Sequence, residues 1–77
     1  MLKPEQIRGA RAMLGLTQAE VARLAGISTT GLNNIERGSS DPKASTLEAI
    51  QRVFEAEGIV FTNGGEPGVK LRRKGQP

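Results

Sequence analysis

The stretch Leu16–Gly38, LTQAEVARLAGISTTGLNNIERG, decides the fold predicted for this chain. Its two helical patterns are joined by Ala25-Gly26-Ile27, a short turn that sends the second helix off at a steep angle. Ala22 has a side chain small enough to let the two helices cross closely. Most helix–glycine–helix patterns are plain structural corners. The side chains on the outer face of the second helix therefore decide whether this pair is interpreted as a functional motif.

Side chains that cap helices mark where both members of the pair begin. Thr17 and Glu20 have the spacing of a capping box, in which each side chain accepts a hydrogen bond from the backbone N–H of the other residue. Ser28 is expected to cap the second helix, which we place over about Ser28–Arg37. Each cap satisfies an N–H group that a helix start otherwise leaves without a partner.

The outer face of the second helix carries short hydrogen-bonding side chains. With successive residues about 100° apart, Leu32 and Ile35 point inward and the polar residues point outward. Asparagine can bond adenine through N6 and N7, and threonine can bond base edges or pack its methyl group on thymine. A helix that is merely solvated more often carries Glu and Lys, so we expect this face to enter a DNA major groove. The predicted base-contacting residues are Thr29, Thr30, Asn33 and Asn34.

Residues that flank this helix are expected to contact DNA phosphates. Gln18 begins the first helix, where its amide and the free backbone N–H groups can face an anion, and Ser28 has the same place in the second helix. Arg37 at the far end and Lys43 in the following loop would supply positive charge. Exposed amide and basic residues are common, so the group as a whole carries this expectation.

Glu36 lies on the flank of the second helix, on the side that an earlier helix can occupy. A carboxylate there would repel phosphate unless it were paired, and Arg11 is the partner that we predict. If this salt bridge is partly buried, loss of one partner costs about 3–5 kcal/mol. Two unrelated surface charges would contribute little.

Helical patterns also lie before and after the pair. The first is expected over about Pro4–Leu14, and Ser45 and Glu48 are expected to form a capping box at the start of the last. Glycine closes helices readily, because it adopts the left-handed conformation at little steric cost. The glycines at which the four patterns end are Gly15, Gly26, Gly38 and Gly58.

After Gly58 the pattern changes to β-branched and aromatic residues. We predict a short strand at Ile59–Thr62, followed by a turn-rich connector and a weaker strand pattern at Val69–Leu71. The first strand can form a local hairpin with the second, or its unpaired N–H and C=O groups can pair with another molecule. Residues from Arg72 onward are expected to be loose.

Composition excludes several classes of protein. The 77 residues contain no cysteine and no histidine, so disulfides, thiolate metal sites and the commonest general bases are missing. No pair of acidic residues stands in an apolar context, and we expect no catalysis, no cofactor and no metal. No apolar run reaches the ~20 residues of a membrane span and no signal peptide is visible, so we expect a cytoplasmic protein without membrane contact.

The net charge of +3 comes from one end of the chain. Residues 1–61 hold seven basic and seven acidic side chains, whereas residues 62–77 hold four basic side chains against Glu66 alone. A body without net charge must bind nucleic acid through the placement of its charges. We interpret the basic tail as a solvated segment rather than a phosphate contact.

Three runs, LGLTQAEVARLAGIS (14–28), IERG (35–38) and DPKASTLEAIQ (41–51), resemble the phage repressor and Cro-type (XRE-like) helix-turn-helix family of transcriptional regulators. The resemblance covers about residues 4–57. It implies an all-α, compact four- to five-helix repressor-like DNA-binding domain, here with a short C-terminal β-strand or hairpin extension. We therefore divide the chain into a helix-turn-helix domain at 1–57 and an extension at 58–77. The resemblance also implies a homodimer that binds a palindromic operator.

Matched residue by residue, this resemblance supports the same site. It places Gln18 where the family commonly touches phosphate, and Lys43 where some members send a basic side chain toward the minor groove. Arg11 and Glu36 match a frequent ion pair of the family. The residues in the base-reading positions are Thr29, Thr30 and Asn34, with Asn33 as an extra one. The chain departs from the family after residue 57, where a clear fifth helix is missing, and this leaves the dimer contacts open.

These observations predict a sequence-specific regulator of transcription that binds double-stranded DNA, with repression as the expected direction. The alternative is a protein–protein adaptor of antitoxin or anti-activator type. The near-neutral body favours that alternative slightly, because DNA binding usually comes with a basic surface.

Overall fold

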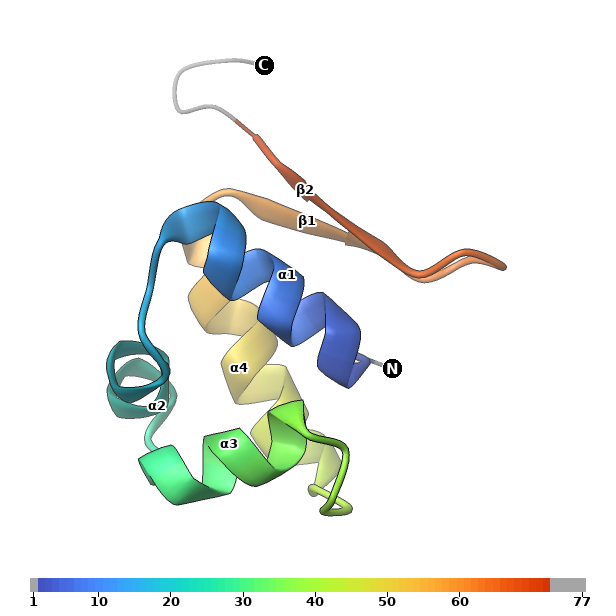
Figure 1. Ribbon diagram of the computed structural model, residues 1–77. Helices are drawn as coiled ribbons and strands as arrows, with labels where there is room; N and C mark the ends of the chain where they lie inside the picture. The colour runs from blue at the N-terminus through green and yellow to red at the C-terminus, as the bar shows by residue number, and fades with distance from the viewer. Residues whose placement is uncertain (1, 73–77) are drawn as a thin grey trace.

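The computed structural model describes residues 2–72, which form four helices and a two-stranded antiparallel hairpin (Figure 1). In chain order the elements are α1 (Pro4–Leu14), α2 (Gln18–Ala25), α3 (Thr29–Glu36), α4 (Ala44–Ala56), β1 (Ile59–Thr62) and β2 (Gly68–Leu71). The predicted fold class, a repressor-like helical domain with a C-terminal hairpin, is confirmed. The chain was expected to be loose from Arg72 onward, but the backbone N–H of Arg72 bonds the carbonyl of Gly58 at 2.8 Å. The rest of that expectation falls on residues 73–77, which lie outside the described residues.

Two of the predicted side-chain caps are present. Thr17 Oγ1 accepts from Glu20 N at 3.1 Å while Glu20 Oε1 accepts from Thr17 N at 3.0 Å. Ser28 Oγ accepts from Gly31 N at 2.9 Å. Between α2 and α3, Gly26 has a φ of 75°, a left-handed conformation that a residue with a Cβ rarely adopts. The sharp turn between these helices depends on it.

The start of α4 differs from the prediction. The helix begins at Ala44 with Lys43 as its flanking residue, so Ser45 lies inside the first turn and the capping box expected between Ser45 and Glu48 is wrong. The carbonyl of Lys43 already accepts from Thr46 N at 3.0 Å, which starts the helix before Ser45. The first residues of α4 are exposed, so water can bond their N–H groups and no side-chain cap is required.

One apolar core joins the helices to the hairpin. α4 packs against α2 and β1, and its Ile50 and Phe54 are fully buried. The ring of Phe54 meets Phe61 of β1 edge-on with the centroids 6.1 Å apart, a favoured aromatic geometry. The buried apolar residues are Leu2, Ile7, Ala10, Val21, Ala22, Leu32, Ile35, Leu47, Ile50, Phe54 and Ile59.

β1 and β2 pair with each other in an antiparallel hairpin, so the first strand pairs within the chain, which is the local alternative predicted from the sequence. Ile59 lies opposite Leu71. The pairing continues to Gly58, whose carbonyl accepts from Arg72 N at 2.8 Å. A Cβ on Gly58 would lie 2.8 Å from the Arg72 carbonyl oxygen, and φ at Gly58 is 97°, so glycine is required at this approach of the two chain segments.

Gln6 of α1 holds the turn end of the hairpin. The residue is only 3% exposed, and its Nε2 donates to the carbonyls of Thr62 at 3.0 Å and Gly68 at 3.1 Å. Its Oε1 accepts from Lys3 N at 2.9 Å, so the same side chain also satisfies an N–H group at the start of α1. Both ends of this amide are therefore bonded, as burial of a polar group requires.

A glycine in the middle of α1 lets β2 approach the helix. A Cβ on Gly9 would lie 3.2 Å from Val69 Cγ2, tighter than an ordinary van der Waals contact. Glycine inside a helix costs about 1 kcal/mol relative to alanine. The close approach of the strand gives a physical reason for glycine at this position.

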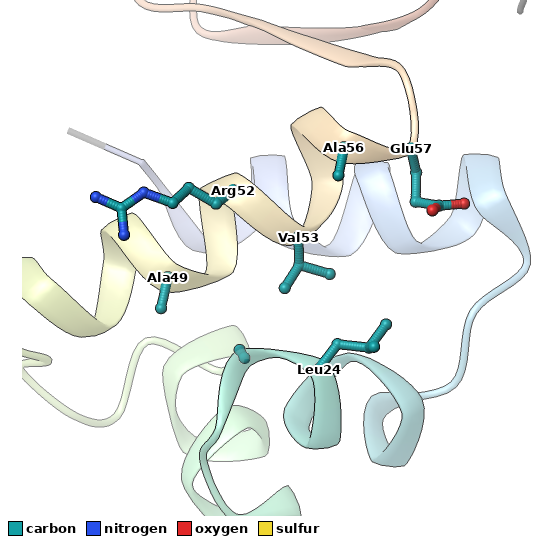
Figure 2. A pocket seen from close by; sticks show the side chains of 7 residues that line it. Leu24, Ala49, Arg52, Val53, Ala56 and Glu57 are labelled. Atoms are coloured by element: carbon teal, nitrogen blue, oxygen red, sulfur yellow. The ribbon is translucent and has the colours of Figure 1, made fainter.

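α2 and α4 leave an apolar groove between them (Figure 2), with a volume of about 400 Å³. Leu24 is 54% exposed and projects into the space below Val53. The lining residues are Leu24, Ala25, Ala49, Arg52, Val53, Ala56 and Glu57. None of them belongs to α3, so this apolar surface is separate from the polar face of the helix predicted to read DNA.

Replacing Gln6 with Leu is expected to loosen the hairpin and to lower the free energy of unfolding by about 1–3 kcal/mol, because partly buried carbonyls lose their donor. Urea unfolding measures the loss, and amide hydrogen exchange should accelerate in Ile59–Thr62. Gln51→Leu is the matched control, since the Gln51 amide bonds Glu55 on the same exposed helix surface at 3.0 Å. Equal effects of the two substitutions would contradict the role given to Gln6.

Candidate nucleic-acid interface

α3 is fixed to the body along one side and open to solvent along the other. Leu32 is fully buried and Ile35 is 6% exposed, whereas Thr29, Thr30 and Arg37 are exposed. In Figure 1, α3 lies at the end of the helical body away from the hairpin. This arrangement leaves the threonines and the arginine free to meet another molecule.

Two of the predicted base-contacting residues lie on the flanks of this open side. Asn33 and Asn34 are both half-buried. Asn33 faces α2, and its Oδ1 accepts from Gln18 Nε2 at 3.2 Å. Asn34 lines a hollow together with residues of the loop that precedes α4. The exposed residues of this segment are therefore Thr29, Thr30 and Arg37, the last of which follows α3, while the two asparagines are half-buried beside them.

The carboxylate of Glu36 is buried where three helices meet, with 3% of the side chain exposed. Arg11 Nε donates to Glu36 Oε2 at 3.0 Å, and Arg11 Nη2 donates to Oε1 at 3.0 Å, which makes a bidentate pair. Gln18 Nε2 adds a third bond to Oε1 at 3.2 Å. One acidic side chain thus connects α1, the start of α2 and α3, and the structure has the two predicted partners in contact.

α1 makes further contacts with later segments of the chain that sequence reasoning missed. Arg11 Nη1 donates to the Leu16 carbonyl at 3.2 Å, and Arg8 Nη1 donates to the backbone carbonyl of Glu36. Arg8 and Arg11 are three residues apart on α1 and therefore share a helix face. That spacing is the signal that could have revealed Arg8 as a second residue holding α3.

The start of α2 is less free to meet an anion than its sequence indicates. Gln18 is half-buried, and its Nε2 is shared between Asn33 and Glu36, so an amide contact with phosphate requires the loss of one of these bonds. The backbone N–H groups of Gln18 and Ala19 form no hydrogen bond within the described residues. These groups, rather than the side-chain amide, are the anion-binding donors that the structure leaves open at this end.

Glu20 places a negative charge close to the same helix start. Its carboxylate accepts from the backbone N–H of Thr17, and this bond is the main reason why the pKa of Glu20 is lowered. A hydrogen bond from the Thr17 side chain lowers the pKa of Glu20 further, and the positive charge of Arg23 adds a smaller contribution in the same direction. Glu20 therefore stays ionised at neutral pH and is held against Thr17.

The other predicted phosphate contacts lie at the two ends of α3. Ser28 Oγ accepts the capping bond and keeps its own hydrogen as a donor. A Cβ on Gly31 would lie 3.0 Å from that oxygen and meets no atom of α2 within 4 Å, so Gly31 leaves room for the cap. Arg37 and Lys43 are exposed, and neither forms an ion pair within residues 2–72.

No helix among residues 2–72 is long and apolar enough to cross a membrane. Nor do acidic side chains in that range gather in a group of three that could hold a metal ion. The chemistry of this surface is that of hydrogen-bond donors and acceptors on α3 and of the charges at its ends.

A model of the helix-turn-helix family matches residues 7–57, a range that includes α2, the turn at Gly26 and α3. The chain belongs to this family. It is a DNA-binding regulator of the XRE type, and the family expected from the sequence is confirmed. The match ends next to the C-terminus of α4, and the hairpin follows it.

Two solved structures are similar to this helix-turn-helix protein. A crystal structure of a mutant of the restriction-modification controller protein C.Esp1396I is 29% identical, covers 68% of each chain and has a TM-score of 0.65. The solution structure of the DNA-binding domain of the P22 C2 repressor is 27% identical, covers 71% of this chain and 72% of that chain, and has a TM-score of 0.65. No curated protein sequence matches the chain.

Breaking the pair of Arg11 and Glu36 is expected to cost stability asymmetrically. Arg11→Ala leaves a buried carboxylate without its cation and should cost about 3 kcal/mol or more. Glu36→Ala should cost less, because Arg11 is 27% exposed and can be hydrated. A double-mutant cycle measured by urea unfolding should give a coupling energy of about 1–3 kcal/mol.

The matched control for this cycle is the pair of Glu48 and Arg52 on α4. Its closest charged atoms are 3.9 Å apart and its side chains are 63% and 78% exposed. The coupling energy there should stay within about 0.5 kcal/mol. Coupling of similar size in both cycles would show that burial does not strengthen the Arg11–Glu36 pair.

Proposed function

We propose that this protein binds double-stranded DNA sequence-specifically, with α3 in the major groove, and represses transcription. The observation that carries the proposal is the chemistry of the exposed side of α3. Thr29 and Thr30 offer hydroxyl groups and methyl groups there, and the only acidic residue of the helix, Glu36, is buried on the opposite side. A polar, acid-free helix face is what the base edges of a major groove can accept.

Groups at both ends of α3 support contact with the DNA backbone. Ser28 lies at the start of α3, and Arg37 and Lys43 follow its end. The open backbone N–H groups at the start of α2 lie beside the C-terminal half of α3, where the Gln18 side chain bonds Asn33 and Glu36. Contacts of this kind fix the register of a protein on the duplex, while the base edges are read from the helix between them. The placement of these few charges compensates for a body without net charge.

We infer that two copies bind a palindromic operator. The domain measures 35 × 28 × 20 Å, so one copy covers about one half-site. Two recognition helices in successive major grooves on one side of the duplex lie about 34–36 Å apart. The similar P22 C2 protein is a repressor, and repression is the direction proposed here for this chain.

Base-reading and phosphate-contacting residues are expected to respond differently to substitution. Asn34→Ala should cost about 1–3 kcal/mol on the preferred site and relax the preference at one base pair. Lys43→Ala should weaken binding to all sequences and reduce the slope of log K against log salt by about one. Selection from a random duplex pool, followed by fluorescence anisotropy at several salt concentrations, measures both.

Two outcomes of these measurements would favour the adaptor function instead. One is a sequence preference that Asn34→Ala leaves unchanged. The other is binding to DNA that hardly responds to salt, because docking of apolar surfaces releases few counterions. Steep salt dependence together with a changed preference supports the proposed regulator.

The dimer is tested by the spacing of half-sites. Inserting about five base pairs between the halves of the selected operator turns them to opposite sides of the duplex and should abolish cooperative binding. An insertion of about ten base pairs returns both half-sites to the same side of the duplex and should recover part of the cooperative binding. Equal affinity for all three spacings would contradict simultaneous binding by two linked copies.

A further inference from the structure

Among the predicted base-contacting residues of α3, Asn33 has a side chain that is hydrogen-bonded to α2. Its partner Gln18 bonds in turn to the buried carboxylate of Glu36. We propose that Glu36, acting through Gln18, fixes which end of the Asn33 amide faces DNA, so that Asn33 presents an N–H donor. Glu36 and Gln18 are then positioning residues for base recognition. The inference rests on the proposed function, since it names the kind of base edge that this part of α3 reads.

The first step is the orientation of the Gln18 amide. An ionised carboxylate paired with an arginine only accepts hydrogen bonds. Glu36 Oε1 lies 3.2 Å from the end of the Gln18 side chain, so that end must be the Nε2 donor. The reversed amide would bring two oxygens together at this distance, one of them on a buried, charged group.

The second step carries this orientation to α3. Gln18 Nε2 has two hydrogens, and with one on Glu36 the other is directed to Asn33 at 3.2 Å. Asn33 must offer its Oδ1 there, because its Nδ2 would set donor against donor. The oxygen therefore faces α2, and the Nδ2 end of the planar amide turns away from it. Within residues 2–72 no hydrogen bond engages Asn33 Nδ2.

The third step is the base edge that fits such a group. A donor is complementary to O6 and N7 of guanine and to O4 of thymine, whereas the N4 group of cytosine is itself a donor. Adenine offers N7 as an acceptor, but its N6 donor group lies beside that N7 and faces the same Nδ2. Bidentate recognition of adenine needs the oxygen and the nitrogen side by side, and here the oxygen is turned to Gln18. The hydrogen bonds that lead from Glu36 through Gln18 to Asn33 form a relay. This relay therefore assigns guanine or thymine to Asn33. Asn34, which has no contact with Gln18, keeps the choice of adenine.

The decisive variant is Asn33→Asp, which preserves the acceptor for Gln18 and replaces the outward donor with a second acceptor. Base preferences are measured by selection from random duplexes and by dissociation constants on sites that differ at one base pair. The wild-type protein should prefer guanine or thymine over cytosine at that base pair by on the order of tenfold. Asn33→Asp should move this preference to cytosine.

Asn34→Asp is the matched control, since it adds the same charge to the same helix without touching Gln18. It should lower affinity for DNA to a similar extent and leave the base pair read by Asn33 unchanged. Gln18→Leu is the second variant, because it removes the relay while keeping the Arg11–Glu36 pair. Affinity for all sequences can fall in this variant, but the selective result is a loss of preference at the Asn33 base pair alone.

A measurement without DNA separates this inference from the proposed function. In the NMR spectrum of the free protein, the Nε2 protons of Gln18 should exchange with water more slowly than the Nδ2 protons of Asn33. The reverse order would overturn the relay, as would an Asn33→Asp protein that still prefers guanine or thymine. A third result is the expected exchange order in a wild-type protein that prefers no DNA sequence. That result would contradict the proposed function and the base-reading step, but it would support the fixed amide orientation.

Discussion

A buried negative charge holds this small protein in one arrangement. The carboxylate of Glu36 is removed from water at the junction of three helices, and such a charge is tolerated only where its lone pairs are fully bonded. Arg11 supplies a bidentate bond from α1, and Gln18 supplies a third bond from α2. Displacement of any one helix would leave part of this charge without a hydrogen-bond partner. Such a displacement is unfavourable, so the three helices keep one relative orientation.

Because α3 is fixed from its inner side, its exposed threonines are not needed to hold it in place. Leu32 and Ile35 pack inward, and Arg8 bonds the carbonyl at the end of the helix, so α3 is held by its inner side and its C-terminus. Thr29 and Thr30 can then differ between relatives without disturbing the core, because they touch solvent. A scaffold of this kind allows recognition to change while the fold is kept.

Local patterns in the sequence were sufficient for the helix pair and insufficient for the contacts of its ends. The capping box of Thr17 and Glu20 and the left-handed Gly26 follow from residues within one turn of each other, and both are present. Arg11 could be paired with Glu36 because a lone carboxylate near phosphate demands a cation. Gln6 could not be placed in this way, since its partners lie 56 and 62 residues further along the chain. The start of α4 was misplaced because a favourable cap does not fix a helix boundary when the first turn is exposed to water.

The fit of the hairpin to α1 has a consequence for how members of this family can be told apart. Position 9 is occupied by glycine, which leaves room for β2 to pass over α1. Position 6 is occupied by a buried glutamine, which supplies a hydrogen-bond donor to the turn end of the hairpin. A relative that ends in a fifth helix has neither need, and its α1 is free to carry alanine or a charged residue at these two places. Glutamine and glycine three residues apart near the beginning of the chain would therefore co-occur with a glycine-rich hairpin near its end, and a genome survey could sort the family into subgroups by this linkage alone.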